Sequence, residues 1–272
     1  MDTTDRNRTS PFAFTGNKFE FRMLGSAISI SCPNIMLNTI AAEELRQFAD
    51  ELEGSTDLEK DVRKIVQRVM KEHKRIIFNG DGYSEAWTQE AKRRGLLNLP
   101  TTVDALPRYL DQKNVELFTS HKIYTEAEME ARYETILEEY SKTLNIEALT
   151  MSEMTRQDIL PAVSAYIASL ADAVASKRAG ISGLPCAAET SLIQKLSGLL
   201  DSAYEKVEAL DALVTDGKAS EYDHNTLRVA TYYKDKIIPA MNELRAVVDQ
   251  MEVDTSAAFW PYPSYGDLMF RV

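Results

Sequence analysis

The sequence predicts a mainly α-helical fold in which a short segment of strands and loops precedes an antiparallel bundle of long helices. Apolar residues recur at steps of three and four along three long segments, roughly 146–178, 188–214 and 221–251. Glycine and proline instead punctuate the first part of the chain, where alternation from Asn17 to Met23 predicts a strand. Three apolar stripes of this length must cover one another, so short turns between the segments favour an antiparallel bundle.

The pattern divides the chain into three regions. Residues 1–54 are expected to form a strand, a loop and a helix, and residues 55–145 a helical connecting region. Residues 146–272 are expected to form the C-terminal helical bundle, followed by an aromatic tail. Pro161 and Pro239 fall inside the helical periodicity of this last region, so we expect them to kink their helices or to mark restarts.

Several helix ends are predicted by capping signals. Gly54 stands where a glycine with positive φ would end the first helix. Thr56 with Glu59 matches a capping box and predicts the start of the next helix. Thr125 with Glu128 has the same spacing, so a further helix is expected to begin there.

The charge and composition of the chain exclude some classes of partner. The 272 residues have a formal net charge of −11, and no basic block stands out. Such a chain repels phosphates, so we expect neither a nucleic-acid partner nor an anionic membrane. No signal-like segment opens the sequence and no stretch approaches the ~20 apolar residues that span a bilayer, which predicts a cytoplasmic protein.

Cysteine and histidine give no recognisable catalytic or zinc pattern. Cys32 and Cys186 lie far apart, without the spacing of a structural zinc site. His73, His121 and His224 are each isolated in sequence, which is typical of surface or capping imidazoles.

One short segment has the pattern of a functional strand. Side chains alternate along a strand, so Lys18, Glu20 and Arg22 are expected on one face. Phe19 and Phe21 would then project from the other face, towards a core. A carboxylate between two cations fits a metal ligand flanked by anion-binding groups, but it also fits a ladder of charges on an exposed strand, which is the commoner case. The residues alone leave both interpretations open.

Three motifs in this part of the chain resemble one known family. Asn7-Arg8-Thr9-Ser10 precedes Lys18-Phe19-Glu20-Phe21-Arg22, and Cys32-Pro33-Asn34 then opens a helix. This order is similar to the end of the glutamine synthetase catalytic domain, where an Asn-Arg-Ser element precedes a basic-x-Glu-x-Arg strand and an Asn-Pro that starts a helix. Four stretches resemble the type III branch in particular, namely residues 5–22, 79–107, 151–161 and 260–268. The resemblance covers nearly the whole chain and places residues 1–54 at the end of the catalytic domain, so the chain is expected to be the C-terminal portion of such an enzyme.

The resemblance implies a role for four residues. Glu20 corresponds to a carboxylate ligand of a divalent cation, Mg²⁺ or Mn²⁺, on the nucleotide side. Arg22 corresponds to the arginine that binds the substrate glutamate, and Arg8 to the catalytic arginine that contacts the transferring phosphate of ATP. Lys18 stands where the family has a basic residue near ATP.

The implied reaction is the ATP-dependent ligation of ammonia to L-glutamate through γ-glutamyl phosphate. Ala13 stands where the family pattern has a further arginine, which removes one ATP contact. The family's other metal carboxylates, its glycine loop and its metal-binding histidine lie upstream of these motifs. The isolated chain is therefore expected to be inactive, with ATP, glutamate and ammonia as partners of the complete enzyme only.

Two functions remain open at this point. The first is the C-terminal part of a glutamine synthetase, which the resemblance implies to be a homo-oligomer of stacked rings. The alternative is a non-catalytic helical assembly or regulatory module derived from the enzyme, in which the strand serves only for docking.

Overall fold

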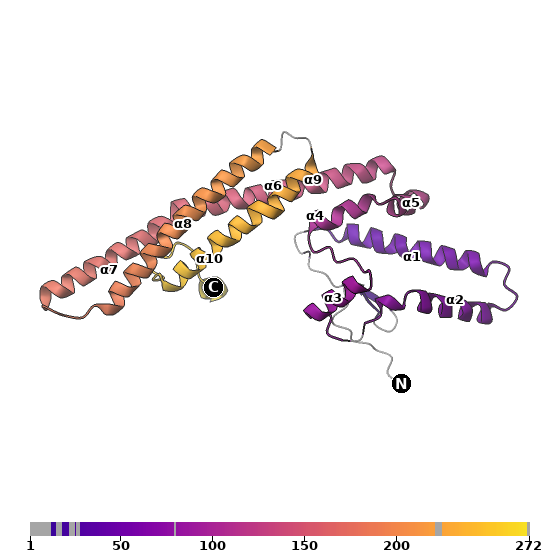
Figure 1. Cartoon of the computed structure of the whole chain (residues 1–272), viewed down its shortest axis with the longest axis horizontal. Helices are drawn as coiled ribbons and strands as arrows, with labels where there is room; N and C mark the ends of the chain where they lie inside the picture. The colour runs from indigo at the N-terminus through magenta and orange to yellow at the C-terminus, as the bar shows by residue number, and fades with distance from the viewer. Residues whose placement is uncertain are drawn as a thin grey trace. The chain divides into compact units, whose positions relative to one another are not determined.

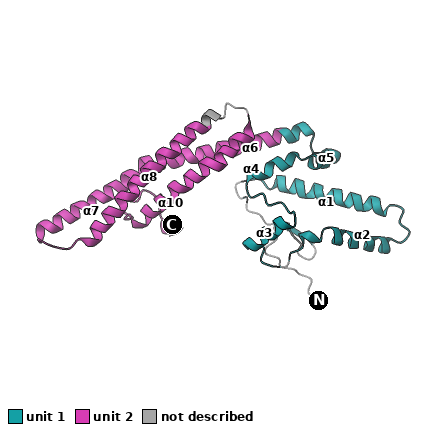
Figure 2. Ribbon diagram, in the orientation of Figure 1, with its two compact units in different colours: residues 1–130 teal, residues 131–272 magenta. Residues whose placement is uncertain are grey.

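The computed structural model describes residues 12–14, 18–21, 25, 28–78, 80–220 and 225–270, and these are mainly helical, as the sequence predicts (Figure 1). The chain forms two compact units, residues 1–130 and residues 131–272 (Figure 2). Each unit has its own buried side chains and is considered by itself below.

A small β-hairpin lies near the start of the first unit. Strand β1 (Phe12–Phe14) pairs antiparallel with β2 (Phe19–Phe21), and Ala13 lies opposite Glu20. The rings of Phe12 and Phe19 stack with their centroids 4.9 Å apart. The prediction that Phe19 faces a core is wrong, because its side chain is 61% exposed. A two-stranded hairpin has no second layer of its own to cover an apolar face, and it is marginally stable unless something else packs on it.

Seven helical segments lie wholly within the described residues of the first unit. They are α1 (Ser31–Leu52), α2 (Leu58–Glu72), η1 (Lys74–Ile76), α3 (Glu85–Arg93), α4 (Thr102–Ala105), η2 (Leu106–Leu110) and α5 (Gln112–Ser120). Gly54 has φ +77° after α1, the left-handed conformation predicted for a terminating glycine. The predicted cap at Thr56 is wrong, because Asp57 caps α2 and its carboxylate accepts a hydrogen bond from the Lys60 N–H at 3.2 Å. Aspartate is the stronger N-cap residue of the two.

A hydrogen-bonded cluster ties α1 to the end of α5. Nε2 of His121 lies 2.7 Å from Oε2 of Glu43, although these residues are far apart in the sequence. Arg46 and Gln47, one turn along α1, also donate to the Glu43 carboxylate, at 2.7 Å each. The pKa of Glu43 is well below its ordinary value. The hydrogen bond from the Arg46 guanidinium is the main cause, followed by those with Gln47 and His121. The His121 side chain is only 20% exposed, and His121 stands at the C-cap of α5, which is one of the two placements that its place in the sequence indicated.

The second unit is a bundle of long helices. Its segments are α6 (Glu126–Met154), which begins in the first unit, the π-helical turn η3 (Thr155–Ile159), α7 (Leu160–Gly180), α8 (Ala187–Ser220), α9 (Thr226–Tyr232), the π-helical turn η5 (Tyr233–Ile237), α10 (Ile238–Asp254) and the short α11 (Tyr265–Phe270). Helix α8 packs against both α7 and α10, which confirms the predicted antiparallel bundle (Figure 1). Its buried face contains Leu196, Ala203, Val207, Leu210 and Val214.

The boundary predicted near residue 145 is not a helix end. Helix α6 runs through it, and η3 and α7 continue the same helical path to Gly180. No glycine or proline interrupts residues 126–160, so nothing stops the helix there. Its predicted start is confirmed, because Thr125 Oγ1 accepts from the Glu128 N–H at 3.3 Å and Glu128 Oε2 accepts from the Thr125 N–H at 2.8 Å.

Pro161 and Pro239, the prolines predicted to kink or restart their helices, each follow a π-helical turn. The Leu160 N–H donates to the Thr155 carbonyl and the Ile238 N–H to the Tyr233 carbonyl, each five residues back. Pro161 and Pro239 lack an N–H, and a proline ring clashes with the carbonyl four residues before it. Widening the turn by one residue accommodates the ring, so these prolines modify their helices without ending them.

The first part of the aromatic tail packs on the bundle, whereas Tyr265 in α11 is 86% exposed. Trp260 and Tyr262 lie against the core of the second unit, and the Tyr262 hydroxyl donates to Asp158 at 2.7 Å. Burial, together with this bond to a carboxylate, raises the pKa of Tyr262 to about 12. The ring of Phe259 also contacts Tyr166 on α7, at 5.2 Å between centroids.

We predict that Leu210→Ala destabilises the second unit. Leu210 is fully buried against α8's neighbours, so truncation should cost about 2–5 kcal/mol through lost contacts and the cavity left behind. Leu149→Ala, at a position that is 40% exposed on α6, is the matched control and should cost clearly less. Urea unfolding followed by circular dichroism measures both variants. Equal losses of stability in the two variants would show that the buried face of α8 is not the core of the second unit.

We also predict that Glu43 makes the first unit sensitive to acid. The folded pKa of Glu43 is lowered, so its contribution to stability is complete above about pH 4.5 and is lost as the pH falls further. Glu43→Gln should therefore lower the melting temperature at pH 7 and reduce the fall in melting temperature between pH 5 and pH 3. Glu44→Gln, on the exposed side of α1, is the control and should leave that fall unchanged. If the Glu43 variant showed the same fall in melting temperature as the unsubstituted chain, this carboxylate would not be the cause of the acid sensitivity.

Candidate functional site

The candidate active-site strand is β2 with the residue before it. Lys18 Nζ lies 3.8 Å from Glu20 Oε1, so the two charged side chains share one face, as alternation predicts. Their side chains are 68% and 38% exposed, respectively. Arg8 and Arg22 lie outside the described residues, and so does Asn7. The structure therefore brings together two of the four predicted site residues, Lys18 and Glu20.

These residues alone do not fit a complete metal site. Among the residues that the structure describes, no group of three or more His, Cys, Asp or Glu side chains is placed to hold a metal ion. Mg²⁺ prefers octahedral coordination by oxygen, often with one or two carboxylates, substrate phosphates and water. The Glu20 carboxylate fits one such position, but its nearest described charged neighbour is a lysine, which opposes a bound cation. Any metal held by Glu20 needs further ligands from outside the described part of this chain.

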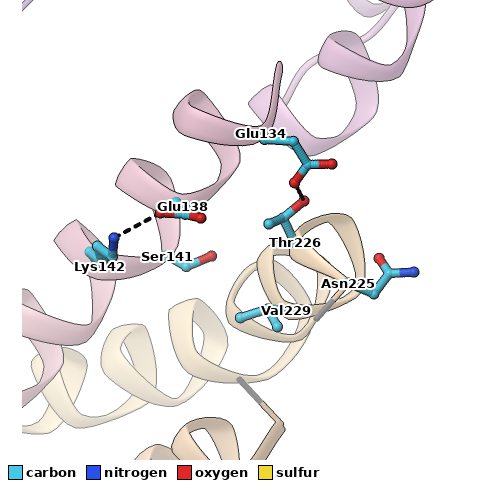
Figure 3. A pocket seen from close by; sticks show the side chains of 7 residues that line it. All are labelled: Glu134, Glu138, Ser141, Lys142, Asn225, Thr226 and Val229. Atoms are coloured by element: carbon cyan, nitrogen blue, oxygen red, sulfur yellow. Dashed lines mark hydrogen bonds and ion pairs between the residues drawn. The ribbon is translucent and has the colours of Figure 1, made fainter. Parts of the chain in front are cut away.

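A polar pocket lies between α6 and α9 in the second unit. Figure 3 shows its lining residues Glu134, Glu138, Ser141, Lys142, Asn225, Thr226 and Val229. The Thr226 hydroxyl donates to Glu134 Oε2 at 2.6 Å, and Lys142 pairs with Glu138 at 2.8 Å one turn along α6 (Figure 3). Asn225 caps α9 by accepting from the Arg228 N–H at 2.9 Å. Glu134 and Glu138 thus have structural partners, and the pocket presents neither a nucleophile with a base nor a cluster of metal ligands.

A charged network joins η3 to α8. Arg156 donates through Nε and Nη2 to Oδ2 of Asp211, at 3.0 and 2.6 Å, and it also pairs with Glu208. Ser152 donates to the other oxygen of Asp211 at 2.6 Å. These carboxylates, with Glu208 first, raise the pKa of Arg156. Sequence patterns missed this network, because its partners lie on different helices.

Two apolar grooves are open on the described surface. The α1–α2 groove, in the first unit, is lined by Phe48, Leu52, Val62, Ile65, Val66, Val69 and Met70. A second groove, between α6 and α10, is lined mainly by Ile146, Met151, Met154, Met241, Leu244 and Val248, with Glu147 and Arg245 at its edges. Neither groove has a group suited to catalysis.

The helical path Glu126–Gly180 contains an 18-residue window with a mean hydropathy of 1.5, of which 11% is buried. By length and composition alone this helix is sufficient to cross a membrane, which the sequence patterns did not predict. One such helix is weak evidence for a span, and α7 packs along α8 in the second unit.

Comparison with known proteins decides the family. A family model described as glutamine synthetase C-terminal domain matches residues 61–178. The chain is 36% identical to a glutamine synthetase of Butyrivibrio fibrisolvens over all of its own length, and 38% identical to the type-3 glutamine synthetase of Dictyostelium discoideum over 99% of it. The chain belongs to the glutamine synthetase family, as a C-terminal part. A glutamine synthetase of Bacteroides fragilis is 32% identical over 99% of the chain.

The chain matches only part of the length of these glutamine synthetases. The chain spans 38% of the length of the Butyrivibrio protein and 37% of the Dictyostelium protein. The family model begins inside α2 and ends close to the end of α7, so the β-hairpin with Lys18 and Glu20 precedes the C-terminal domain.

Proposed function

We propose that this chain acts as the C-terminal part of a glutamine synthetase that ligates ammonia to L-glutamate at the expense of ATP. The observation that supports the proposal best is similarity to glutamine synthetases over 99–100% of the chain, at 32–38% identity. Chance similarity in helical periodicity does not extend through a strand, a loop and two helical units in order.

The proposed reaction has two steps. The side-chain carboxylate of glutamate attacks the γ-phosphate of ATP, which yields γ-glutamyl phosphate and ADP. Ammonia then attacks the activated carbonyl, phosphate leaves, and a proton is lost from nitrogen to give glutamine. Positioning and charge neutralisation contribute most of the catalysis in such phosphoryl transfers.

The strand β2 would contribute part of the site in this enzyme. Glu20 is proposed as one carboxylate ligand of Mg²⁺ or Mn²⁺, and Lys18 as a neighbour of ATP. Arg22 is proposed to bind the glutamate substrate and Arg8 to contact the transferring phosphate. The exposure of the Lys18 and Glu20 side chains supports this assignment, because a residue that meets a ligand must not be buried in its own unit.

The assembly and location of the enzyme are also proposals. We infer a cytoplasmic homo-oligomer of stacked rings without a nucleic-acid or membrane partner, in keeping with the net charge of −11. The alternative, a non-catalytic module, is favoured by one observation: the second unit buries a core of its own around α8, with no residue of the candidate site in it.

We predict that the isolated chain makes no glutamine. One metal carboxylate and two arginines cannot surround ATP, glutamate and ammonia, so the remaining ligands must come from the part of the enzyme that this chain does not match. An assay of ATP- and glutamate-dependent glutamine formation, on a preparation free of other synthetases, tests this. Turnover by the chain alone would overturn the assignment of the site to a larger protein.

Our sharpest prediction for the complete enzyme concerns Glu20. Glu20→Ala removes a metal ligand, so it should reduce turnover by more than about 100-fold and weaken metal-ATP binding in parallel. This loss is larger than the loss expected for a residue that only supports a ligand. The matched control is Glu44→Ala on the exposed side of α1, where turnover should change little. Glu43 is unsuited as a control, because it is bonded to His121.

Turnover and metal-ATP affinity should be measured for both variants, with circular dichroism to check folding. If Glu20 is one charge in an exposed ladder, its removal costs about 1 kcal/mol or less and leaves turnover intact. That outcome would contradict the proposed active-site strand.

A further inference from the structure

Helix α2 has an apolar stripe that its own unit leaves exposed. Leu58, Val62, Val66 and Met70 recur every fourth residue, which places them along one side of the helix. Their exposed fractions are 60, 39, 54 and 55%, and no residue of α2 is buried. A strongly amphipathic helix normally buries its apolar side, so this stripe indicates a surface that another element covers.

Val62, Val66 and Met70 of the stripe, together with Ile65 and Val69, form one wall of the α1–α2 groove. Phe48 and Leu52 on α1 form the opposite wall, and the lining is almost wholly apolar. An ion pair stands next to the lining residues Leu52 and Val69 in the sequence, since Arg68 Nη2 lies 2.5 and 2.7 Å from the two carboxylate oxygens of Glu51. A groove between two helices, apolar inside and charged at the edge, is the surface on which a third apolar-faced helix packs.

The charges on α2 do not fit a lipid surface. Three of the five cations on α2, Lys60, Lys64 and Lys71, lie on the side opposite the apolar stripe, given 3.6 residues per turn. With the stripe in lipid, these ammonium groups would point away from the headgroups, whereas helices that lie on membranes hold their cations at the headgroup level. A net charge of −11 adds repulsion from an anionic membrane.

We propose that the α1–α2 groove is the surface on which the catalytic part of the glutamine synthetase docks, the part that the relatives have and this chain does not match. The inference rests on the proposed function. Most of the length of each relative lies outside the match, so a large body of protein is available to cover the groove.

The position of the groove in the chain supports this occupant. Helix α1 begins at Ser31, soon after β2 ends at Phe21, and both belong to the first unit. Any protein that completes a site around Glu20 must therefore contact the first unit. The groove and the exposed side of Phe19 are apolar surfaces of that unit which such a contact would bury.

Cysteine labelling tests this docking directly. In a Cys32→Ser background, Val66→Cys places a thiol in the groove. The matched control Gln67→Cys places one about 100° further around α2, outside the groove lining, and Cys186 is buried. Joining the chain to the catalytic part should slow maleimide labelling at position 66 by about tenfold or more, because labelling then requires local opening. Labelling at position 67 should stay unchanged.

Three outcomes would overturn the proposal. Equal labelling at position 66 in the isolated chain and the complete enzyme would mean that the groove stays open. Protection in the isolated chain that disappears on dilution would identify a second copy of the chain as the occupant, and protection that requires anionic phospholipid vesicles would identify a lipid surface. Labelling does not depend on turnover, so an inactive enzyme with position 66 protected would refute the proposed function and leave the docking surface standing.

Val66→Asp provides a second measurement. A buried, unpaired carboxylate is costly, so this variant should lower the melting temperature of the complete enzyme, while the isolated chain, in which Val66 is 54% exposed, keeps its circular dichroism spectrum and melting temperature. Gln67→Asp should change neither protein. Equal effects of Val66→Asp on both proteins would show that position 66 supports the first unit itself and would contradict docking.

Discussion

The burial of α8 is the constraint on which the second unit depends. Helix α8 carries apolar residues along its length, and its inner face, formed by Leu196, Ala203, Val207, Leu210 and Val214, is almost completely buried between α7 and α10. Each flanking helix has α8 as its main partner, so the loss of that contact would leave two amphipathic helices without cover. The ion pairs at the edges of the bundle, such as that of Lys206 with Glu243, help to fix the register of the helices. They add little stability, because they are accessible to solvent.

Sequence periodicity predicted the helices well because burial on one side repeats at a fixed interval. It could not show that α6 continues through the predicted region boundary at residue 145, since helical periodicity is the same on both sides and no stop signal marks an end there. The partnership of His121 with Glu43 depends on folding between distant segments, which periodicity does not encode. For the candidate site, alternation correctly placed Lys18 and Glu20 on one face, but the exposure of Phe19 follows from what packs on the hairpin.

Both units leave apolar surface uncovered, but in different places. The second unit closes around a continuous core and exposes apolar side chains in α11, such as Leu268 and Phe270, whereas the first exposes the α2 stripe and the ring of Phe19. The exposed apolar surface of the first unit therefore lies in the same unit as the proposed site residues Lys18 and Glu20. Among the described residues, Glu20 has Lys18 beside it and belongs to no cluster of metal ligands.

The two π-helical turns, η3 and η5, affect how the sequences of relatives align with these helices. Buried residues follow at steps of four through each turn, at 155, 159 and 163 in one helix and at 229, 233 and 237 in the other. In a regular α-helix each step of four drifts by about 40°, so the wider turn keeps these residues facing α8. Each turn is therefore equivalent to one inserted residue. A relative with one residue fewer there would present the same faces through an ordinary α-helix, and the gap in its alignment would record a change of winding, not a lost contact.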